Sequence, residues 1–204
     1  MSGQTPCPAS PQLLAPEAWT SIDFISDLHL DQAHPLTQQA FVDYLAHTPA
    51  SAVMILGDLF EVWVGDDGRQ LPFEAACTAA MAQAGQRLWL GLMVGNRDFL
   101  IGPEMLAACH AHALPDPLLL EAFGQRHVVT HGDAWCLSDT EYLAFRGMVR
   151  QDAWQQAFLA KPLAERLVTA RGIRQQSEAR KMAHEPQMWA DVDAAHASEF
   201  LRQG

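Results

Sequence analysis

The chain has 204 residues, 49% of them hydrophobic, which is enough for one domain with a substantial core. Its formal net charge of −11 argues against a general nucleic-acid-binding protein. No apolar run approaches the roughly 20 residues that a membrane-spanning helix needs. Residues 1–18 are rich in proline and lack the basic and apolar regions of a signal peptide. We therefore expect a loose N-terminal extension, a cytoplasmic protein and, because no cysteines form a CxxC pair, reduced thiols.

Apolar runs alternate with helix-like segments in the first half of the chain. Strands are predicted at residues 21–26, 51–56 and 87–94, and helices at residues 34–48, 72–86 and 102–112. This alternation is typical of an α/β protein whose mostly parallel sheet is covered on both faces.

The pattern changes in the second half of the chain. Two further strands, 118–123 and 126–131, are separated by Gly124-Gln125, and a glycine at the first loop position predicts a type II′ hairpin. From Ser138 onward the sequence is almost entirely helical. Its amphipathic stripe consists of Trp154, Phe158, Leu159, Leu163 and Leu167.

Four predicted strands are followed by side chains that bind metal ions. These side chains are Asp27, His29, Asp58, Asn96 and His131. Ligands of open α/β sheets bind beyond the carboxyl ends of the strands, so we expect the five to converge at one edge. Mixed carboxylate, amide and imidazole ligands suit Mn²⁺, Fe²⁺ or Zn²⁺. A carboxylate such as Asp58 can bridge two ions about 3.5–4 Å apart, the geometry used for in-line attack on phosphorus.

Each piece of this pattern also has a structural interpretation. Asp27-x-His29 is a triplet that occurs by chance in many chains, and a lone histidine such as His131 is more often structural than a ligand. Asp58 and Asn96 both follow a glycine, as ordinary turn residues do. All four pieces in order, each at a strand end, favour the metal site.

The set D-x-H, GD, GN and HGD resembles the calcineurin-like metallophosphoesterases. The fuller strings GDLFEVWVGDD (57–67), GNRDFL (95–100) and HGDAWCLSD (131–139) closely resemble the UDP-2,3-diacylglucosamine pyrophosphatases of that superfamily. The resemblance covers about residue 19 to the end of the chain. It implies a layered α-β-β-α sandwich over residues 19–204, with a helical cap inserted at residues 138–185.

The resemblance also implies an activity and a place for it. The family are hydrolases of lipid A biosynthesis that cleave the diphosphate of UDP-2,3-diacylglucosamine to UMP and lipid X with two Mn²⁺ ions. A metal-activated water attacks, and no further catalytic residue is implied. Such an enzyme would be peripheral on the cytoplasmic face of the inner membrane. The alternatives are a metallophosphoesterase for another phosphodiester and a catalytically impaired lipid- or metal-binding remnant.

Several residues match family positions that bind substrate. They are Asn96, Arg97, Asp139, Ser177 and Lys181. Most of the superfamily carries histidine, a general acid, where Arg97 stands. A phosphate leaving group needs no acid, whereas a guanidinium can hold a diphosphate with two parallel hydrogen bonds. The alternative for Arg97 is a surface salt bridge with Asp98.

The helical cap of the family holds two acyl chains, and the stripe from Trp154 to Leu167 lies at the matching place. It is compatible with an acyl groove and equally with packing on the core. Eight basic residues lie between Arg146 and Lys181, against three acidic ones. They form either a solvated helix face or a face for an anionic membrane.

Family members carry one further motif, Gly-His-x-His, near their end. The sequence ends at Gly204 without it, and His184 and His196 stand in a different context. The expected fold therefore lacks its last strands, and the expected metal site lacks two imidazoles.

Overall fold

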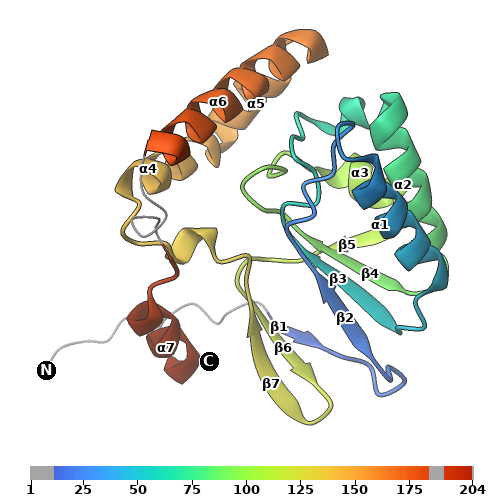
Figure 1. Cartoon of the computed structure of the whole chain (residues 1–204). Helices are drawn as coiled ribbons and strands as arrows, with labels where there is room; N and C mark the ends of the chain where they lie inside the picture. Colours follow the sequence, from blue (N-terminus) through green and yellow to red (C-terminus); the bar gives the residue numbers. More distant parts are fainter. Residues whose placement is uncertain (1–11, 184–190, 204) are drawn as a thin grey trace, which may run out of the picture.

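The computed structural model describes residues 12–183 and 191–203, which form two β-sheets, a layer of helices and a helical cap (Figure 1). The first sheet is parallel, with the strand order β2-β3-β4-β5. Its strands are β2 (Ile22–Ile25), β3 (Ala52–Leu56), β4 (Trp89–Met93) and β5 (Ala111–Ala113). The predicted parallel sheet is confirmed.

Three helices connect these strands and begin with a proline, which suits the first turn because its missing N–H has no partner there. They are α1 (Pro35–His47), α2 (Pro72–Gly85) and α3 (Pro103–Ala108). All three lie on the same side of the parallel sheet (Figure 1), as right-handed crossovers between strands in sequential order require.

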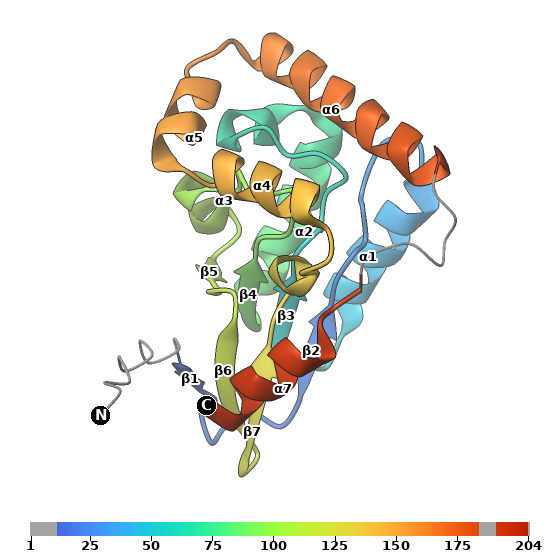
Figure 2. The ribbon, with the colours of Figure 1, turned by 90° about the vertical axis from the view of Figure 1, so that its left-hand side faces the viewer.

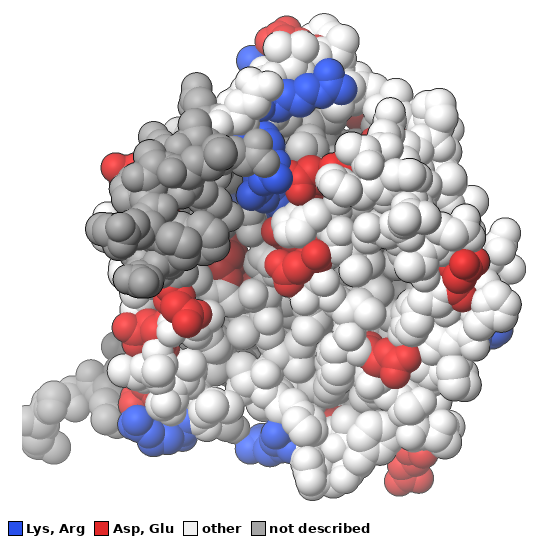
Figure 3. Space-filling view, viewed as in Figure 1, with Lys and Arg blue, Asp and Glu red and all other residues white. Residues whose placement is uncertain are grey.

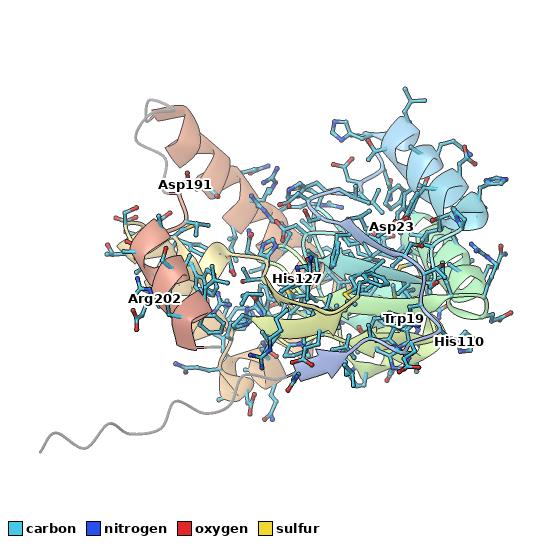
Figure 4. All side chains as sticks on the ribbon, turned by 90° about the horizontal axis from the view of Figure 1, so that it is seen from below. Trp19, Asp23, His110, His127, Asp191 and Arg202 are labelled. Atoms are coloured by element: carbon cyan, nitrogen blue, oxygen red, sulfur yellow. The ribbon has the colours of Figure 1, made fainter. Side chains whose placement is uncertain are left out.

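The other face of the parallel sheet packs on a second sheet. Its strands, in the order β1-β6-β7, are β1 (Gln12–Leu14), β6 (Leu118–Ala122) and β7 (Gln125–Val129). Strand side chains alternate between two cores: Val53 and Ile55 face the helices, whereas Met54 contacts the second sheet. Trp19 enters this second core, with its ring centroid 5.1 Å from that of Trp89 (Figure 4).

Helix α7 (Ala194–Gln203) lies in front of β6 and β7 in Figure 2, on the side away from the parallel sheet. The order of layers thus agrees with the expected α-β-β-α sandwich. The cap consists of α4 (Thr140–Val149), α5 (Asp152–Leu159) and α6 (Leu163–Ala183), which gather at one end of the molecule (Figures 1 and 2).

Three local predictions are wrong. Residues 12–14 form β1, parallel to β6, instead of belonging to a loose extension; residues 1–11 lie outside the described part. The helix predicted at residues 102–112 ends at Ala108, and β5 follows. Phe123 and Gly124 both have positive φ, 53° and 76°, so the hairpin turn is one residue earlier and of the I′ kind.

Candidate metal centre

The five predicted ligands lie together at the carboxyl ends of β2, β3, β4 and β7. Donor atoms of Asp27, His29 and Asp58 are all within 4.8 Å of one another. His29 Nε2 lies 3.7 Å from Asp58 Oδ2, and His131 Nε2 lies 3.7 Å from Asp58 Oδ1. The Asn96 amide is 3.2 Å from His131 Nε2. Asp58 therefore occupies the middle of the cluster.

The backbone at three of these residues adopts the left-handed conformation. The φ angles are 54° at Asp27, 47° at His29 and 52° at Asp58. Non-glycine residues in this region cost of the order of 1–3 kcal/mol each and are concentrated at functional sites. Two backbone hydrogen bonds hold them: Asp27 N–H donates to the Gly57 carbonyl at 3.1 Å, and His29 N–H donates to the Asp58 carbonyl at 3.0 Å.

Two glycines let the loops approach each other. A Cβ atom at Gly57, whose φ is 95°, would lie 2.7 Å from His131 Nδ1. A Cβ at Gly95 would lie 2.1 Å from Asp58 Oδ1. Any side chain at these positions would push the ligands of neighbouring strands apart.

Asp98 has a role that no sequence pattern indicated. Its side chain is completely buried, and its carboxylate accepts hydrogen bonds from the N–H groups of Gly95 at 2.7 Å and Leu59 at 2.8 Å. Burial raises the pKa of Asp98 to about 6. Asp98 thus ties the loop of Asn96 to the loop of Asp58, and the surface ion pair considered from the sequence is wrong for this carboxylate.

Burial and charge both act on the central carboxylate. Burial raises the pKa of Asp58, while the backbone N–H of Arg97, which donates to Asp58 Oδ1 at 2.9 Å, and the two imidazoles oppose that rise. The contact with Glu61 raises the pKa of His29. The cluster thus brings carboxylate, amide and imidazole donors together. These donors match the ligand preferences of Mn²⁺, Fe²⁺ or Zn²⁺.

A cavity of about 1050 Å³ adjoins this cluster and extends under the cap. Asn96, Arg97, Asp139 and Ser177 all line it. Asp139 also caps α4, since it accepts a hydrogen bond from Tyr142 N–H at 2.9 Å. Basic and acidic side chains adjoin one another between the cap and the sheets in Figure 3. The side chain of Lys181 lies outside the described residues.

The rest of the cavity wall is largely apolar. The rings of Trp154 and Phe158 stack with their centroids 4.9 Å apart, and both line the cavity. Phe158 is also buried in the main core, and Trp154, Leu163 and Leu167 pack against that core. Of the two interpretations of the stripe, core packing therefore applies to all four side chains, and Trp154 and Phe158 are in addition part of the cavity wall.

Several basic residues of the cap point inward. Arg166 is 3% exposed and pairs with Asp67. Arg146 pairs with Asp133 at 2.9 Å, and Arg150 donates to the Gly95 carbonyl at 2.8 Å. These contacts anchor the cap on the loops around the cluster. The three side chains do not contribute to an exposed basic face.

Of the two C-terminal histidines considered from the sequence, the structure describes His196, which does not belong to the cluster. His196, on α7, lies against Trp135 with ring centroids 5.6 Å apart. His184 lies outside the described residues. Among the helices in the described ranges, none combines the length and apolarity required to cross a membrane.

Comparisons with known proteins place the chain in a family. It is 51% identical to a UDP-2,3-diacylglucosamine hydrolase of Chromobacterium violaceum over 79% of this chain and 68% of that protein. Proteins of the same name from Bordetella pertussis and Xanthomonas campestris are 43% and 40% identical, over 87% and 89% of this chain and 70% and 77% of theirs.

Two further comparisons do not bear on the family. No family model matches the chain. A solved structure of a protein of unknown function from Aquifex aeolicus has a TM-score of 0.37 and 17% identity, covering 67% of this chain and 73% of that one. The sequence relatives alone show the family, and the chain belongs to the UDP-2,3-diacylglucosamine hydrolases.

Proposed function

We propose that the protein hydrolyses the diphosphate of UDP-2,3-diacylglucosamine, releasing UMP and lipid X, with two divalent ions, Mn²⁺ by preference. The observation that carries the proposal is that a cluster of metal donors adjoins a large cavity. The cavity wall is polar next to the cluster and mainly apolar under the cap. This cavity matches a substrate with an anionic centre and two acyl chains. The names of the relatives support the same substrate.

The metal ligands in this proposal are the five side chains at the strand ends. Asp58 would touch both ions, because its two oxygens face His29 on one side and His131 on the other. Asp27 and His29 would complete one ion site, and Asn96 and His131 the other. When bound, the ions supply an activated water and positive charge for the phosphoryl oxygens.

Arg97 would hold the diphosphate. Its backbone is fixed on both sides, since its N–H donates to Asp58 Oδ1 at 2.9 Å and its carbonyl accepts from Trp63 N–H at 3.1 Å. The side chain lines the cavity beside Asn96. A guanidinium there can bind a phosphoryl group through two parallel hydrogen bonds, which a histidine cannot do.

Further substrate contacts are proposed for Asp139, Ser177 and Lys181. The proposal is supported for two of them by their position in the cavity wall. Asp139 lines the cavity from the N-terminus of α4, and Ser177 lines it from α6. Each is polar in a wall that is mainly apolar. They suit the sugar and its amide groups, while the aromatic part of the wall suits the acyl chains.

A peripheral position on the cytoplasmic face of the inner membrane fits the exposed side chains of the cap region. Large apolar residues stand in solvent there: Leu137, Met148, Leu159, Val168 and Ile173. Apolar side chains on amphipathic helices are suited to the boundary of a bilayer, where the acylated substrate resides. Sedimentation with vesicles, compared between the protein and a Val168→Ser/Leu159→Ser variant, tests this point.

The activity is tested by measuring UMP release from UDP-2,3-diacylglucosamine with added Mn²⁺ and with a chelator. Metal-dependent release supports the proposal. Release only from a general substrate such as bis(p-nitrophenyl) phosphate would favour a different phosphodiesterase. Binding of Mn²⁺ and lipid with no release from either substrate would favour a binding protein.

A further inference from the structure

Glu61 lies between the candidate metal centre and the cap. It belongs to the loop after β3, and its side chain is only 14% exposed. One oxygen, Oε2, lies 3.0 Å from His29 Nδ1. The other, Oε1, forms an ion pair with Arg174 of α6. The backbone fixes this position, since Glu61 N–H donates to the Leu30 carbonyl at 3.1 Å.

The two ring nitrogens of His29 face different partners. Nε2 lies 3.7 Å from Asp58 Oδ2, on the side of the metal donors, whereas Nδ1 is next to Glu61. A carboxylate at Nδ1 favours the tautomer with its proton on that nitrogen. The lone pair of Nε2 then remains for a metal ion.

Arg174 extends the contact to the cavity. Its side chain lines the cavity wall, and Ser177 lines it from the next turn of the same helix. The main loop-to-cap anchor on the described part of α6, the ion pair of Arg166 with Asp67, lies about two turns earlier and does not involve His29. The cap is thus joined to this loop at two points, and only one of them leads to a metal donor.

We propose that Glu61 is a positioning residue that orients the His29 imidazole toward the metal ion and couples it to cap helix α6 through Arg174. This inference rests on the proposed metal centre. The alternative is that Glu61 merely holds the loop and the cap together. The two differ in metal affinity, because loss of a carboxylate behind a ligating histidine typically weakens metal binding about 10–100-fold.

The test is Mn²⁺ binding to the metal-free protein, measured by titration calorimetry and by the free-ion EPR signal. Glu61→Ala should weaken binding about 10–100-fold. Glu61→Gln should recover part of the loss, since its amide oxygen can still accept from Nδ1. Arg174→Met should weaken binding less than Glu61→Ala and should add little to it in the double variant, because both changes act on one contact chain.

Asp67→Asn is the matched control, because it loosens the other anchor of α6 without touching His29. Its Mn²⁺ affinity should equal that of the wild type. Equal losses for Asp67→Asn and Glu61→Ala would overturn the inference and leave Glu61 as a cap anchor. Wild-type affinity in Glu61→Gln and Glu61→Ala would also overturn it.

Asp58→Ala separates this inference from the proposed function. If Asp58→Ala leaves Mn²⁺ binding unchanged, the metal centre itself is wrong, and the inference falls with it. If Asp58→Ala abolishes binding while both Glu61 variants bind normally, the metal centre stands and only the role of Glu61 is wrong. Far-UV circular dichroism confirms that each variant is folded.

Discussion

His131 Nε2 lies 3.7 Å from Asp58 Oδ1, although His131 follows the last strand of one sheet and Asp58 follows a central strand of the other. On its opposite side, Asp58 Oδ2 lies 3.7 Å from His29 Nε2. One carboxylate therefore stands between donors that come from both sheets. A change at Asp58 should disturb every part of the cluster at once.

Asp58→Ala should nearly abolish UMP release and remove bound Mn²⁺, because the central carboxylate would position both ions. Asp27→Ala and His131→Ala should cause partial losses, since each would touch fewer ions. Steady-state kinetics and metal analysis of the purified variants measure these effects. Activity of Asp58→Ala within a few-fold of the wild type would rule out a shared ligand. Asp43→Ala, on the exposed side of α1, serves as the unaffected control.

Arg97→Lys should lower kcat/KM on the natural substrate while the Mn²⁺ content stays constant. Lysine keeps the charge but loses the planar fork that binds two phosphoryl oxygens. Metal analysis and kinetics on the same preparation separate the two effects. A rise in activity for Arg97→His would mean that this leaving group does need a general acid.

Ile173→Ala should weaken binding of the diacylated substrate more than binding of a deacylated UDP-sugar. Ile173 lines the cavity and is 37% exposed, so its loss creates little cavity in the core. Gln175→Ala, on the same helix, exposed and away from the cavity wall, is the control and should change neither affinity. Inhibition constants for the two ligands provide the comparison.

Trp154→Ala and Phe158→Ala should show the same selectivity, together with a loss of stability. Phe158 is buried in the main core, where a change from phenylalanine to alanine typically costs about 3–5 kcal/mol. Binding of both ligands and urea unfolding of each variant measure the two effects. Equal effects on the acylated and deacylated ligands would mean that these two rings only pack the core.

Asp67→Asn should lower the urea midpoint of unfolding at pH 7. The hydrogen bond from Arg166 lowers the pKa of Asp67 below its ordinary value, so the folded state favours the ionised carboxylate. The contribution of the ionised carboxylate to the free energy of unfolding is complete above its ordinary pKa of about 3.9. This contribution is lost as the pH falls through the lower pKa of Asp67 in the folded protein. The difference between wild type and variant should therefore be constant from about pH 7 to pH 5 and shrink below about pH 4.

Glu104→Gln is the control for this ion pair. Glu104 is 69% exposed and lies 2.9 Å from Arg69, and exposed pairs of this kind contribute little to stability. Its urea midpoint should match the wild type at every pH. A difference between Asp67→Asn and wild type that grows as the pH falls would mean that the fold does not favour the ionised form of Asp67.

Phe123→Asn should raise the melting temperature. Phe123 has a φ of 53° at the first position of a turn that favours Asn-Gly, and its side chain is 61% exposed. Relief of the left-handed strain is worth about 1 kcal/mol, or about 2–4 °C for a domain of this size. Gly124→Ala should lower the melting temperature, because alanine is strained at the φ of 76° found there. A Cβ at this position meets no atom within 4 Å, so the backbone strain is the whole effect. Differential scanning calorimetry of both variants measures the two shifts.

Local sequence patterns were enough to predict the parallel sheet, its connecting helices and the candidate ligands. These features follow from local patterns: apolar runs of strand length, prolines at helix starts, and metal-binding side chains directly after strands. Because parallel strands bring their carboxyl ends to one edge, Asp58 and Asn96 had to be neighbours once the sheet was predicted. His131 was predicted at the same edge, but its strand is antiparallel to β6 in the second sheet, so the packing of the two sheets brings it to Asp58.

Features that depend on partners far along the chain could not be predicted from these patterns. Strand β1 exists because Gln12–Leu14 pairs with β6, which lies far along the chain, and so short a segment carries no periodicity of its own. Asp98, Arg166 and Glu61 look like surface charges in the sequence, yet each is enclosed by groups from other elements. A buried charge is stable only where the fold supplies its hydrogen-bond or ion-pair partner, and that partner is set by the packing of loops and cap rather than by neighbouring residues.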